Sequence, residues 1–277
     1  MDIKLILLDL DGTLLTSEKQ ISPANYDALE RCAAAGVHIV PSTGRIYSGM
    51  PQVVRDLPFM RYVVAVNGAQ VYDVKEDKVL CREEIELDAA FRVYDELDKL
   101  PVIYDCYMGG SGYDDAAMYE RIDEFISDPH VNAMVKGTRK PVPDLRAFLR
   151  EQGCPLQKIQ MFFKNMERRA KELERLPKLF PDLAVTSSIA NNIEFNAKNA
   201  NKGEALRFLC RHLGLDVSES MSFGDSSNDL SMIVAAGVGV AMANADRALL
   251  DAADYVTDTN DNDGVAKAIA RFCPTFS

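Results

Sequence analysis

The sequence lacks several features that would place the protein in a special class. Its six cysteines are spread along the chain and form no Cys-x-x-Cys pair, which argues against a disulfide framework or a cysteine zinc site. No apolar run approaches the length of a membrane-spanning helix, and the first residues lack the basic and cleavage regions of a signal peptide. We therefore expect a cytoplasmic protein with reduced thiols.

Positive charge is also scarce. The chain of 277 residues has 31 lysines and arginines against 42 aspartates and glutamates, which gives a net charge of −11. Such a chain is poorly suited to replace the counterions along a nucleic-acid backbone, so neither nucleic acid nor a membrane is an expected partner. A small anionic substrate stays open, because a bound cation can reverse the local electric field.

Short apolar runs alternate with helical patterns at both ends of the chain. Residues 3–8 form a near-continuous apolar run, typical of a strand buried on both faces. Ser22-Pro23 then predicts the start of a helix, and residues 37–40 and 61–66 predict the next strands. The same rhythm resumes with a helix over 202–213. This β-α-β order predicts an α/β fold with a doubly wound, Rossmann-like parallel sheet.

The middle of the chain has a different pattern. A helix over residues 87–100 is followed by strand-like runs at 101–107 and 112–118, and a later helix at 165–180 by two short strands around an Asn turn. Helices combined with hairpins predict an inserted α+β domain with an antiparallel sheet. We place the domain borders so that residues 1–84 and 188–277 form the core and residues 85–187 form the inserted cap.

Chemically capable side chains follow the predicted parallel strands, where open α/β sheets place their ligands. They are Asp9 and Asp11, Thr43-Gly44, Lys202, and the run Gly224-Asp225-Ser226-Ser227-Asn228-Asp229. Each taken singly has a plainer explanation as a turn, a helix cap or a solvated lysine. Their joint occurrence in this order is much harder to explain in that way.

The combination suits phosphoryl transfer. Converging carboxylates repel one another unless a hard cation such as Mg²⁺ lies between them. Lys202 supplies a second positive charge, and the Thr43 hydroxyl can hold phosphate oxygens. A carboxylate nucleophile would divide ester hydrolysis into formation and breakdown of an acyl phosphate, and a second carboxylate would transfer the protons.

At this point the sequence resembles the haloacid dehalogenase superfamily of phosphatases, in particular its Cof-type (IIB) branch. The resemblance extends over nearly the whole chain, and its long insertion between Thr43 and Lys202 matches the cap of that branch. The matching segments are Asp9-Leu10-Asp11-Gly12-Thr13-Leu14, Pro41-Ser42-Thr43-Gly44-Arg45, Asn67-Gly68-Ala69, Asn201-Lys202-Gly203-Glu204-Ala205-Leu206 and Gly224-Asp225-Ser226-Ser227-Asn228-Asp229-Leu230.

The resemblance implies a role for each motif residue. Asp9 would be the nucleophile and Asp11 the general acid and base. The Asp9 carboxylate, the Asp11 backbone carbonyl and the Asp225 carboxylate would hold Mg²⁺. Asp229 would orient Lys202 or metal-bound water. The phosphate would be bound by the Leu10 backbone N–H, Thr43, Gly44, Lys202 and Asn228.

Several alternatives stay open at this stage. The leading hypothesis is a phosphatase of small phosphorylated metabolites, such as sugar phosphates or phosphorylated cofactors. A phosphomutase would use the same motifs, and a non-catalytic phospho-aspartate receiver would share the acidic residues but lacks room for a cap of about a hundred residues. The substrate itself and the cap residues that select it are not readable from the sequence. We expect a monomer or a weak homo-oligomer.

Overall fold

The computed structural model describes residues 2–273, which divide into two compact units. Of these residues, unit 1 contains 2–44, 50–81 and 201–273, and unit 2 contains 45–49 and 82–200. The predicted second border at 187/188 therefore differs from the observed return to unit 1 at Asn201. The reason is the strand Asn192–Ala197, which pairs with both neighbouring strands of the unit 2 sheet and cannot leave that unit.

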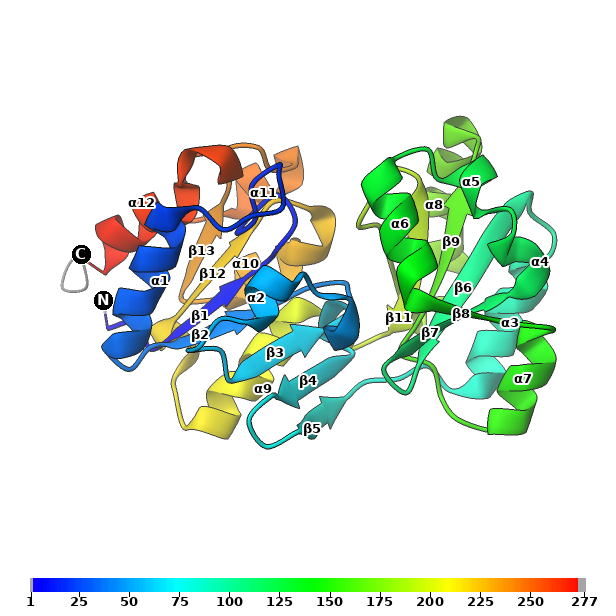
Figure 1. The fold of residues 1–277 in the computed structure, drawn as a ribbon, viewed down its shortest axis with the longest axis horizontal. Coiled ribbons are helices and arrows are strands. Elements are labelled where there is room, and N and C mark those ends of the chain that lie inside the picture. The colour runs from blue at the N-terminus through cyan, green and yellow to red at the C-terminus, as the bar shows by residue number, and fades with distance from the viewer. Residues whose placement is uncertain (1, 274–277) are drawn as a thin grey trace. The chain divides into compact units, whose positions relative to one another are not determined.

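A five-stranded parallel sheet forms the centre of unit 1 (Figure 1). Its strands, in spatial order, are β14 (Tyr255–Val256), β13 (Val238–Ala241), β12 (Ser220–Gly224), β1 (Leu5–Leu8) and β2 (His38–Pro41). All four residues of β1 are fully buried, as the continuous apolar run predicted. The expected α/β core with an inserted α+β cap is confirmed.

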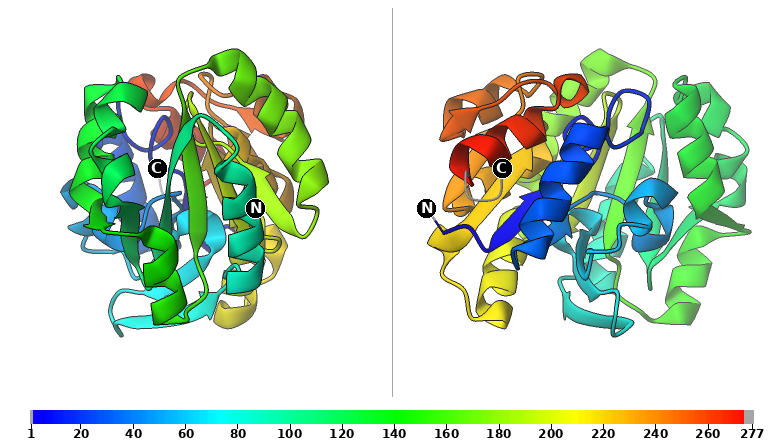
Figure 2. Two further views of the ribbon diagram at one scale, coloured as in Figure 1. Left: turned by 90° about the vertical axis from the view of Figure 1, so that its right-hand side faces the viewer. Right: turned by 60° about the vertical axis from the view of Figure 1, so that its left-hand side comes forward.

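Helices cover both faces of this sheet. They are α1 (Pro23–Ala34), α2 (Gln52–Arg55), α9 (Lys202–Leu213), α10 (Leu230–Ala235), α11 (Arg247–Ala252) and α12 (Gly264–Phe272). Helices α9 and α10 pack on the face that carries Leu5 and Leu7. Helices α1 and α12 lie side by side on the other face (Figure 2). Ser22 caps α1 as predicted, since its hydroxyl accepts the Asn25 N–H at 3.2 Å.

The predicted strand at residues 61–66 does not continue the parallel sheet. It forms β3 (Tyr62–Ala65) of a separate antiparallel sheet with β4 (Gln70–Asp73) and β5 (Lys78–Arg82). A single parallel bridge, between Ser42 and Val64, joins this sheet to the end of β2. After β3 the chain turns back and forms β4. Strand β3 therefore pairs along its whole length with β4.

Unit 2 is built on a six-stranded sheet with helices packed against it (Figure 1). Its strands, in spatial order, are β10 (Leu183–Thr186), β11 (Asn192–Ala197), β9 (Lys158–Phe163), β6 (Val102–Met108), β7 (Ser111–Asp115) and β8 (Arg139–Val142). Its helices are α3 (Leu87–Leu97), α4 (Ala116–Tyr119), α5 (Ile122–Phe125), α6 (Pro129–Thr138), α7 (Leu145–Gln152) and α8 (Met166–Leu179). The strand pairs are antiparallel except for β7 and β8.

The two faces of the unit 2 sheet differ in polarity. One face carries apolar side chains that pack with α3, α7 and α8. On the other face Glu194, Gln160, Asp105 and Asp114 stand opposite one another in register on four neighbouring strands, and all are buried. Alternation of side chains along each strand produces this division. The inserted domain therefore has a buried polar layer as well as an apolar core.

The predicted end of one strand of unit 2 is wrong. The run 112–118 was expected to be extended, but β7 stops at Asp115 and α4 begins at Ala116. The Asp115 side chain accepts the Ala117 N–H at 3.0 Å and so caps the new helix. Within residues 2–273, no helix has both the length and the apolar character needed to span a membrane.

Candidate active site

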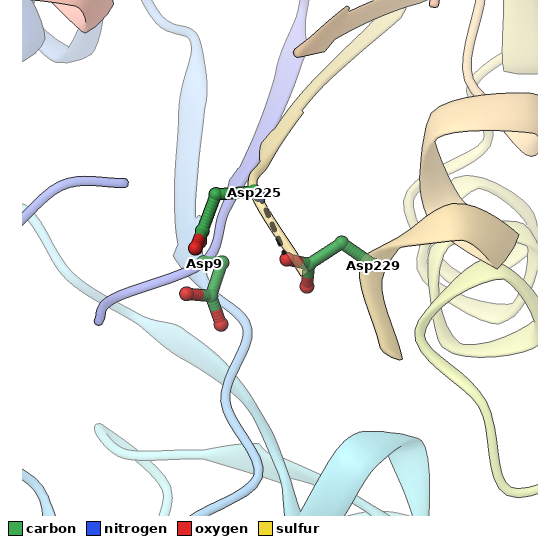
Figure 3. Close-up of side chains that lie close together, drawn as sticks. All are labelled: Asp9, Asp225 and Asp229. Atoms are coloured by element: carbon green, nitrogen blue, oxygen red, sulfur yellow. Dashed lines mark hydrogen bonds between the residues drawn. The ribbon is translucent and has the colours of Figure 1, made fainter. Parts of the chain in front are cut away.

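Two neighbouring strands place Asp9 and Asp225 beside each other. β1 and β12 run parallel with Leu8 opposite Phe223, and an aspartate follows the end of each strand. The Asp9 N–H donates to the Phe223 carbonyl at 3.0 Å, which extends the sheet pairing to the aspartate itself. Carboxylate oxygens of Asp9, Asp225 and Asp229 all lie within 4.8 Å of one another (Figure 3).

Lys202 is the cation of this group. It is the first residue of α9 and is completely buried. Its ammonium donates to Asp9 Oδ1 at 2.5 Å, to Asp229 Oδ1 at 2.5 Å and to the Ser42 carbonyl at 2.8 Å. Burial opposes the charge, but the carboxylates of Asp229 and Asp9 outweigh burial and raise the pKa of Lys202. The lysine therefore remains a cation with all three donors directed at oxygen.

One ammonium does not balance three carboxylates. Burial and, next, the charge of Asp229 raise the pKa of Asp9 well above its usual range, although Lys202 acts in the opposite direction. The same two causes raise the pKa of Asp225 to about 6. The cluster thus has an affinity for further positive charge, which either protons or a metal ion can supply.

Asp225 and Asp229 are held in different ways. Asp225 accepts the Thr13 hydroxyl on Oδ1 at 2.9 Å and the Ser226 hydroxyl on Oδ2 at 3.0 Å. Asp229 uses Oδ1 for Lys202 and Oδ2 for the backbone N–H groups of Asp225 and Ser226, both at 3.0 Å. Both oxygens of Asp229 are therefore occupied by donors of the protein, whereas the donors to the Asp225 carboxylate among the described residues are neutral hydroxyl groups.

Asp11 lies outside the carboxylate cluster that contains Asp9. Its Oδ1 accepts from the Lys19 ammonium at 2.8 Å, and 38% of its side chain is exposed. Leu10, between the two aspartates, is buried in the turn, and its carbonyl accepts the Leu15 N–H at 2.9 Å. An exposed ion pair of this kind contributes little to stability.

The remaining predicted residues lie in the turns beside the cluster. Thr43 is buried just after β2, and its N–H donates to the Val64 carbonyl at 2.9 Å. Gly44 follows it and adjoins the side chain of Asn67. Asn228 donates from Nδ2 to Asn67 Oδ1 at 3.1 Å. Thr43, Gly44 and Asn228 thus gather around Asn67, while Lys202 contacts the carbonyl of Ser42, the residue before Thr43.

Comparison with known proteins decides the family. Residues 6–269 match the model of the haloacid dehalogenase-like hydrolases. The chain belongs to this family. The expected superfamily is confirmed, and so is the expected enzyme class, a phosphatase.

Named relatives match this hydrolase over nearly its whole length. The phosphatase YwpJ of Bacillus subtilis is 33% identical, and the alignment covers 95% of this chain and 98% of that protein. The 5-amino-6-(5-phospho-D-ribitylamino)uracil phosphatase YcsE of the same organism is 31% identical, with 98% and 96% covered. The pyridoxal phosphate phosphatase YbhA of Escherichia coli is 27% identical, with 97% and 98% covered.

Solved structures share the fold of this hydrolase. A haloacid dehalogenase-like hydrolase from B. subtilis superimposes with a TM-score of 0.83 at 30% identity, covering 98% of this chain and 100% of the other. A subclass IIB sugar phosphatase gives a TM-score of 0.79 at 24% identity, covering 98% and 99%. Both cover the inserted cap as well as the core.

Several side chains that shape this site of the hydrolase were not among the predicted residues. Thr13 and Ser226 hold Asp225, Lys19 pairs with Asp11, and Asn67 contacts Asn228. Thr13 and Ser226 stand inside the recognised motifs, so their hydroxyl groups were a readable signal. Lys19 gave no signal, because its contact with Asp11 depends on how the loop after β1 folds back.

Proposed function

We propose that this chain is a Mg²⁺-dependent phosphatase of small phosphorylated metabolites that forms an aspartyl-phosphate intermediate on Asp9. The observation that carries the proposal is the buried Asp9 carboxylate, held by Lys202 on Oδ1 and flanked by Asp225. Among residues 2–273, the hydrogen bond that Asp9 accepts from a side chain goes to Oδ1, which leaves Oδ2 for chemistry. A nucleophile needs such a fixed but incompletely bonded oxygen.

The donor set fits Mg²⁺. The group consists of three carboxylates and the ammonium of Lys202. Among the described residues its possible ligand atoms are carboxylate oxygens, with no sulfur or imidazole. Asp9 and Asp225 would hold the ion together with the Asp11 backbone carbonyl, while Asp229 is committed to Lys202 and to two N–H groups. A bound Mg²⁺ would neutralise phosphate charge and align the ester for in-line attack.

The residues of the chain divide the reaction into two steps. An Asp9 oxygen attacks phosphorus, the ester P–O bond breaks, and Asp11 gives its proton to the leaving alkoxide. Asp11 then takes a proton from water, the water oxygen attacks the phosphorus of the acyl phosphate, and the P–O bond to Asp9 breaks. Lys202, Thr43, Gly44, Asn228 and the Leu10 N–H would bind the phosphate oxygens throughout.

The exposed position of Asp11 supports its role as the proton carrier. A group that protonates a leaving group and then activates a water molecule must be reachable by both, and 38% of the Asp11 side chain is exposed. Its Lys19 partner can swing aside at little cost because the pair is solvated. Asp9, by contrast, is fixed by its buried contacts. The two aspartates thus differ in burial as nucleophile and proton carrier should.

The substrate class follows from the family rather than from the site. Relatives include phosphatases named for a ribitylamino uracil phosphate and for pyridoxal phosphate. We propose that this chain likewise removes phosphate from sugar phosphates or phosphorylated cofactors. Because one chain supplies the whole carboxylate–lysine cluster, we also propose that it acts as a monomer or a weak homo-oligomer.

Replacement of Asp9 by asparagine tests the mechanism. Uncatalysed hydrolysis of phosphate monoesters is so slow that an enzyme must lower its barrier by on the order of 20 kcal/mol. Turnover without the nucleophile should therefore be undetectable. The measurement is phosphate release from a panel of phosphorylated metabolites with Mg²⁺, including both relatives' substrates. Near-normal turnover by the Asp9→Asn variant would show that another group attacks. Isomerisation without phosphate release would show a mutase instead.

A further inference from the structure

A strained turn follows β3 in unit 1. Val66, Asn67 and Gly68 have φ angles of 52°, 56° and 97°, so three successive residues adopt left-handed backbone. Asparagine tolerates this conformation better than most residues, but a β-branched valine rarely adopts it. Holding such residues in this conformation costs folding free energy, and the conformation persists only where the surrounding structure enforces it. The contacts of the turn show which parts of the site this conformation holds in place.

The backbone of the turn ties together two parts of the phosphate site. The Asn67 N–H donates to the Thr43 carbonyl at 2.9 Å, and the Thr43 N–H donates to the Val64 carbonyl at 2.9 Å. On its other side, Gly68 lies against Asn201, the residue before Lys202. A Cβ atom on Gly68 would come within 2.3 Å of the Asn201 carbonyl oxygen. The turn therefore sets the spacing between Thr43 and the start of α9.

The Asn67 side chain reaches a third part of the site. It is 3% exposed, and its Oδ1 accepts the Nδ2 of Asn228 at 3.1 Å. A Cβ atom on Gly44 would lie 2.9 Å from the same oxygen, so only glycine at position 44 permits the approach. One side chain thus contacts both Gly44 and Asn228, which come from distant parts of the sequence.

Asn228 is left ready for a ligand. Its Oδ1 is buried and has no hydrogen-bond partner among the described residues, and Asn67 takes only one of the two Nδ2 hydrogens. A buried amide is normally satisfied by protein or by water. Asn67 fixes which end of the amide is the donor, and so presents the remaining N–H, the group that can donate to a phosphate oxygen, in a defined orientation.

We propose that Asn67 is a positioning residue for phosphate binding, which acts by orienting Asn228 and by fixing Gly44 against it. The proposal rests on the proposed function, because it takes phosphate as the group that Asn228 and Gly44 bind. A turn that merely joins β3 to β4 would require the backbone conformation but not the Asn67 amide. The two roles are therefore separable by substitution.

Asn67→Gly separates them, because glycine keeps the left-handed backbone and removes the amide. We expect the inhibition constant of inorganic phosphate and the KM of p-nitrophenyl phosphate to rise about ten-fold, the effect of losing a hydrogen bond to a charged ligand. The kcat should change far less, because the lost contact binds substrate and transition state alike. The melting temperature should stay close to that of the wild type.

A matched control comes from the same unit. Asp77 also has a positive φ of 49°, and its side chain accepts the Tyr72 hydroxyl. It lies exposed in the turn between β4 and β5, away from the phosphate site. Asp77→Gly thus removes an equivalent side chain from an equivalent conformation, and the inhibition constant of phosphate should not change.

A double-mutant cycle with Asn228→Ala decides whether Asn67 acts through Asn228. If it does, Asn67→Gly should weaken phosphate binding about ten-fold in the wild type but less than about two-fold once the Asn228 amide is gone. Additive effects, or a lower melting temperature with unchanged phosphate inhibition, would overturn the proposal and leave a structural turn. The readout does not depend on the nucleophile, so turnover by Asp9→Asn would refute the mechanism alone. A wild type that does not bind phosphate would refute the phosphate site and the role of Asn67 together.

Discussion

The two units bury charge in different ways. In unit 1 the carboxylates of Asp9, Asp225 and Asp229 share one ammonium, that of Lys202. In unit 2 three acids and two cations meet on the polar face of the sheet. There Arg139 Nε donates to Asp105 Oδ2 at 3.0 Å, and Lys158 Nζ donates to Glu194 Oε1 at 2.9 Å. The third acid, Asp114, stands directly opposite Asp105.

Protonation removes the excess charge of unit 2. Burial first, and the neighbouring Asp105 second, raise the pKa of Asp114 to about 8, so at neutral pH this carboxyl group holds its proton. Two anions then face two cations, and both cations also stack on the Tyr107 ring. Unit 2 is balanced once Asp114 is protonated, whereas in unit 1 the raised pKa values of both Asp9 and Asp225 show that two carboxyl groups compete for further positive charge. That contrast agrees with the proposal that the first cluster binds a cation, and it makes the second cluster part of the structure of unit 2.

The largest expected effect tests the unbalanced cluster. Lys202→Met keeps the length of the side chain but leaves three buried carboxylates without their ammonium. The free energy of unfolding of unit 1 should fall toward the upper end of ~3–5 kcal/mol in the presence of EDTA. Because a divalent cation can replace the lost charge, excess Mg²⁺ should restore part of it by binding the folded state. Calorimetry with and without Mg²⁺ measures both changes.

A control for this variant is Lys78→Met, which removes an exposed lysine from β5 of the same unit. Its stability should stay within ~0.5 kcal/mol of the wild type and should respond to Mg²⁺ as the wild type does. Equal losses in EDTA and in Mg²⁺ for Lys202→Met would contradict the comparison, since the cluster would then have no use for a cation.

The balanced cluster should respond differently to the same kind of change. Arg139→Met leaves Asp105 buried with Gln160 as its remaining side-chain donor, at 2.9 Å. Because Asp114 already holds a proton, Asp105 is the one carboxylate that loses a cationic partner. The free energy of unfolding of unit 2 should therefore fall by an amount toward the lower end of ~3–5 kcal/mol. Mg²⁺ should restore none of it. The exposed pair Arg92–Asp182 supplies the control, since Arg92→Met should cost under ~1 kcal/mol. Rescue of Arg139→Met by Mg²⁺ would show that unit 2 also binds the ion.

The sequence predicts the cluster of unit 1 far better than that of unit 2. Asp9, Lys202 and Asp225 each end or begin a strongly patterned element, and parallel strands bring such ends to one edge of the sheet. Their convergence was therefore predictable. That Lys202 also binds the Ser42 carbonyl was not, because it depends on how deeply α9 packs.

The polar layer of unit 2 gave no comparable signal. Asp105 and Asp114 lie in runs that the sequence predicts as strands, but their partners depend on the register between strands, some of them distant in the sequence. Asn67 is an intermediate case. The Asn-Gly pair indicates a turn, yet only the folded chain brings its amide to Asn228.

Per unit of pH, the smallest expected change is a dependence of stability on pH that belongs to unit 2. Asp114 holds a proton in the folded protein up to about pH 8, whereas the unfolded chain loses it near pH 4. Between these values the folded state binds more protons, so this group lowers the stability of unit 2 as the pH rises, by up to ~1.4 kcal/mol per unit of pH. Asp114→Asn cannot ionise and removes this slope.

The variant should therefore gain stability relative to the wild type from pH 5 to pH 8, and the difference should become constant above pH 8. Calorimetric melting at four pH values measures it, with the exposed Asp88→Asn of α3 as a control that should follow the wild type. If Asp114→Asn instead runs parallel to the wild type over this range, the carboxyl group is already ionised at neutral pH. Unit 2 would then contain buried carboxylates in excess of its cations, as unit 1 does, and charge balance would no longer distinguish the proposed catalytic cluster from the structural one.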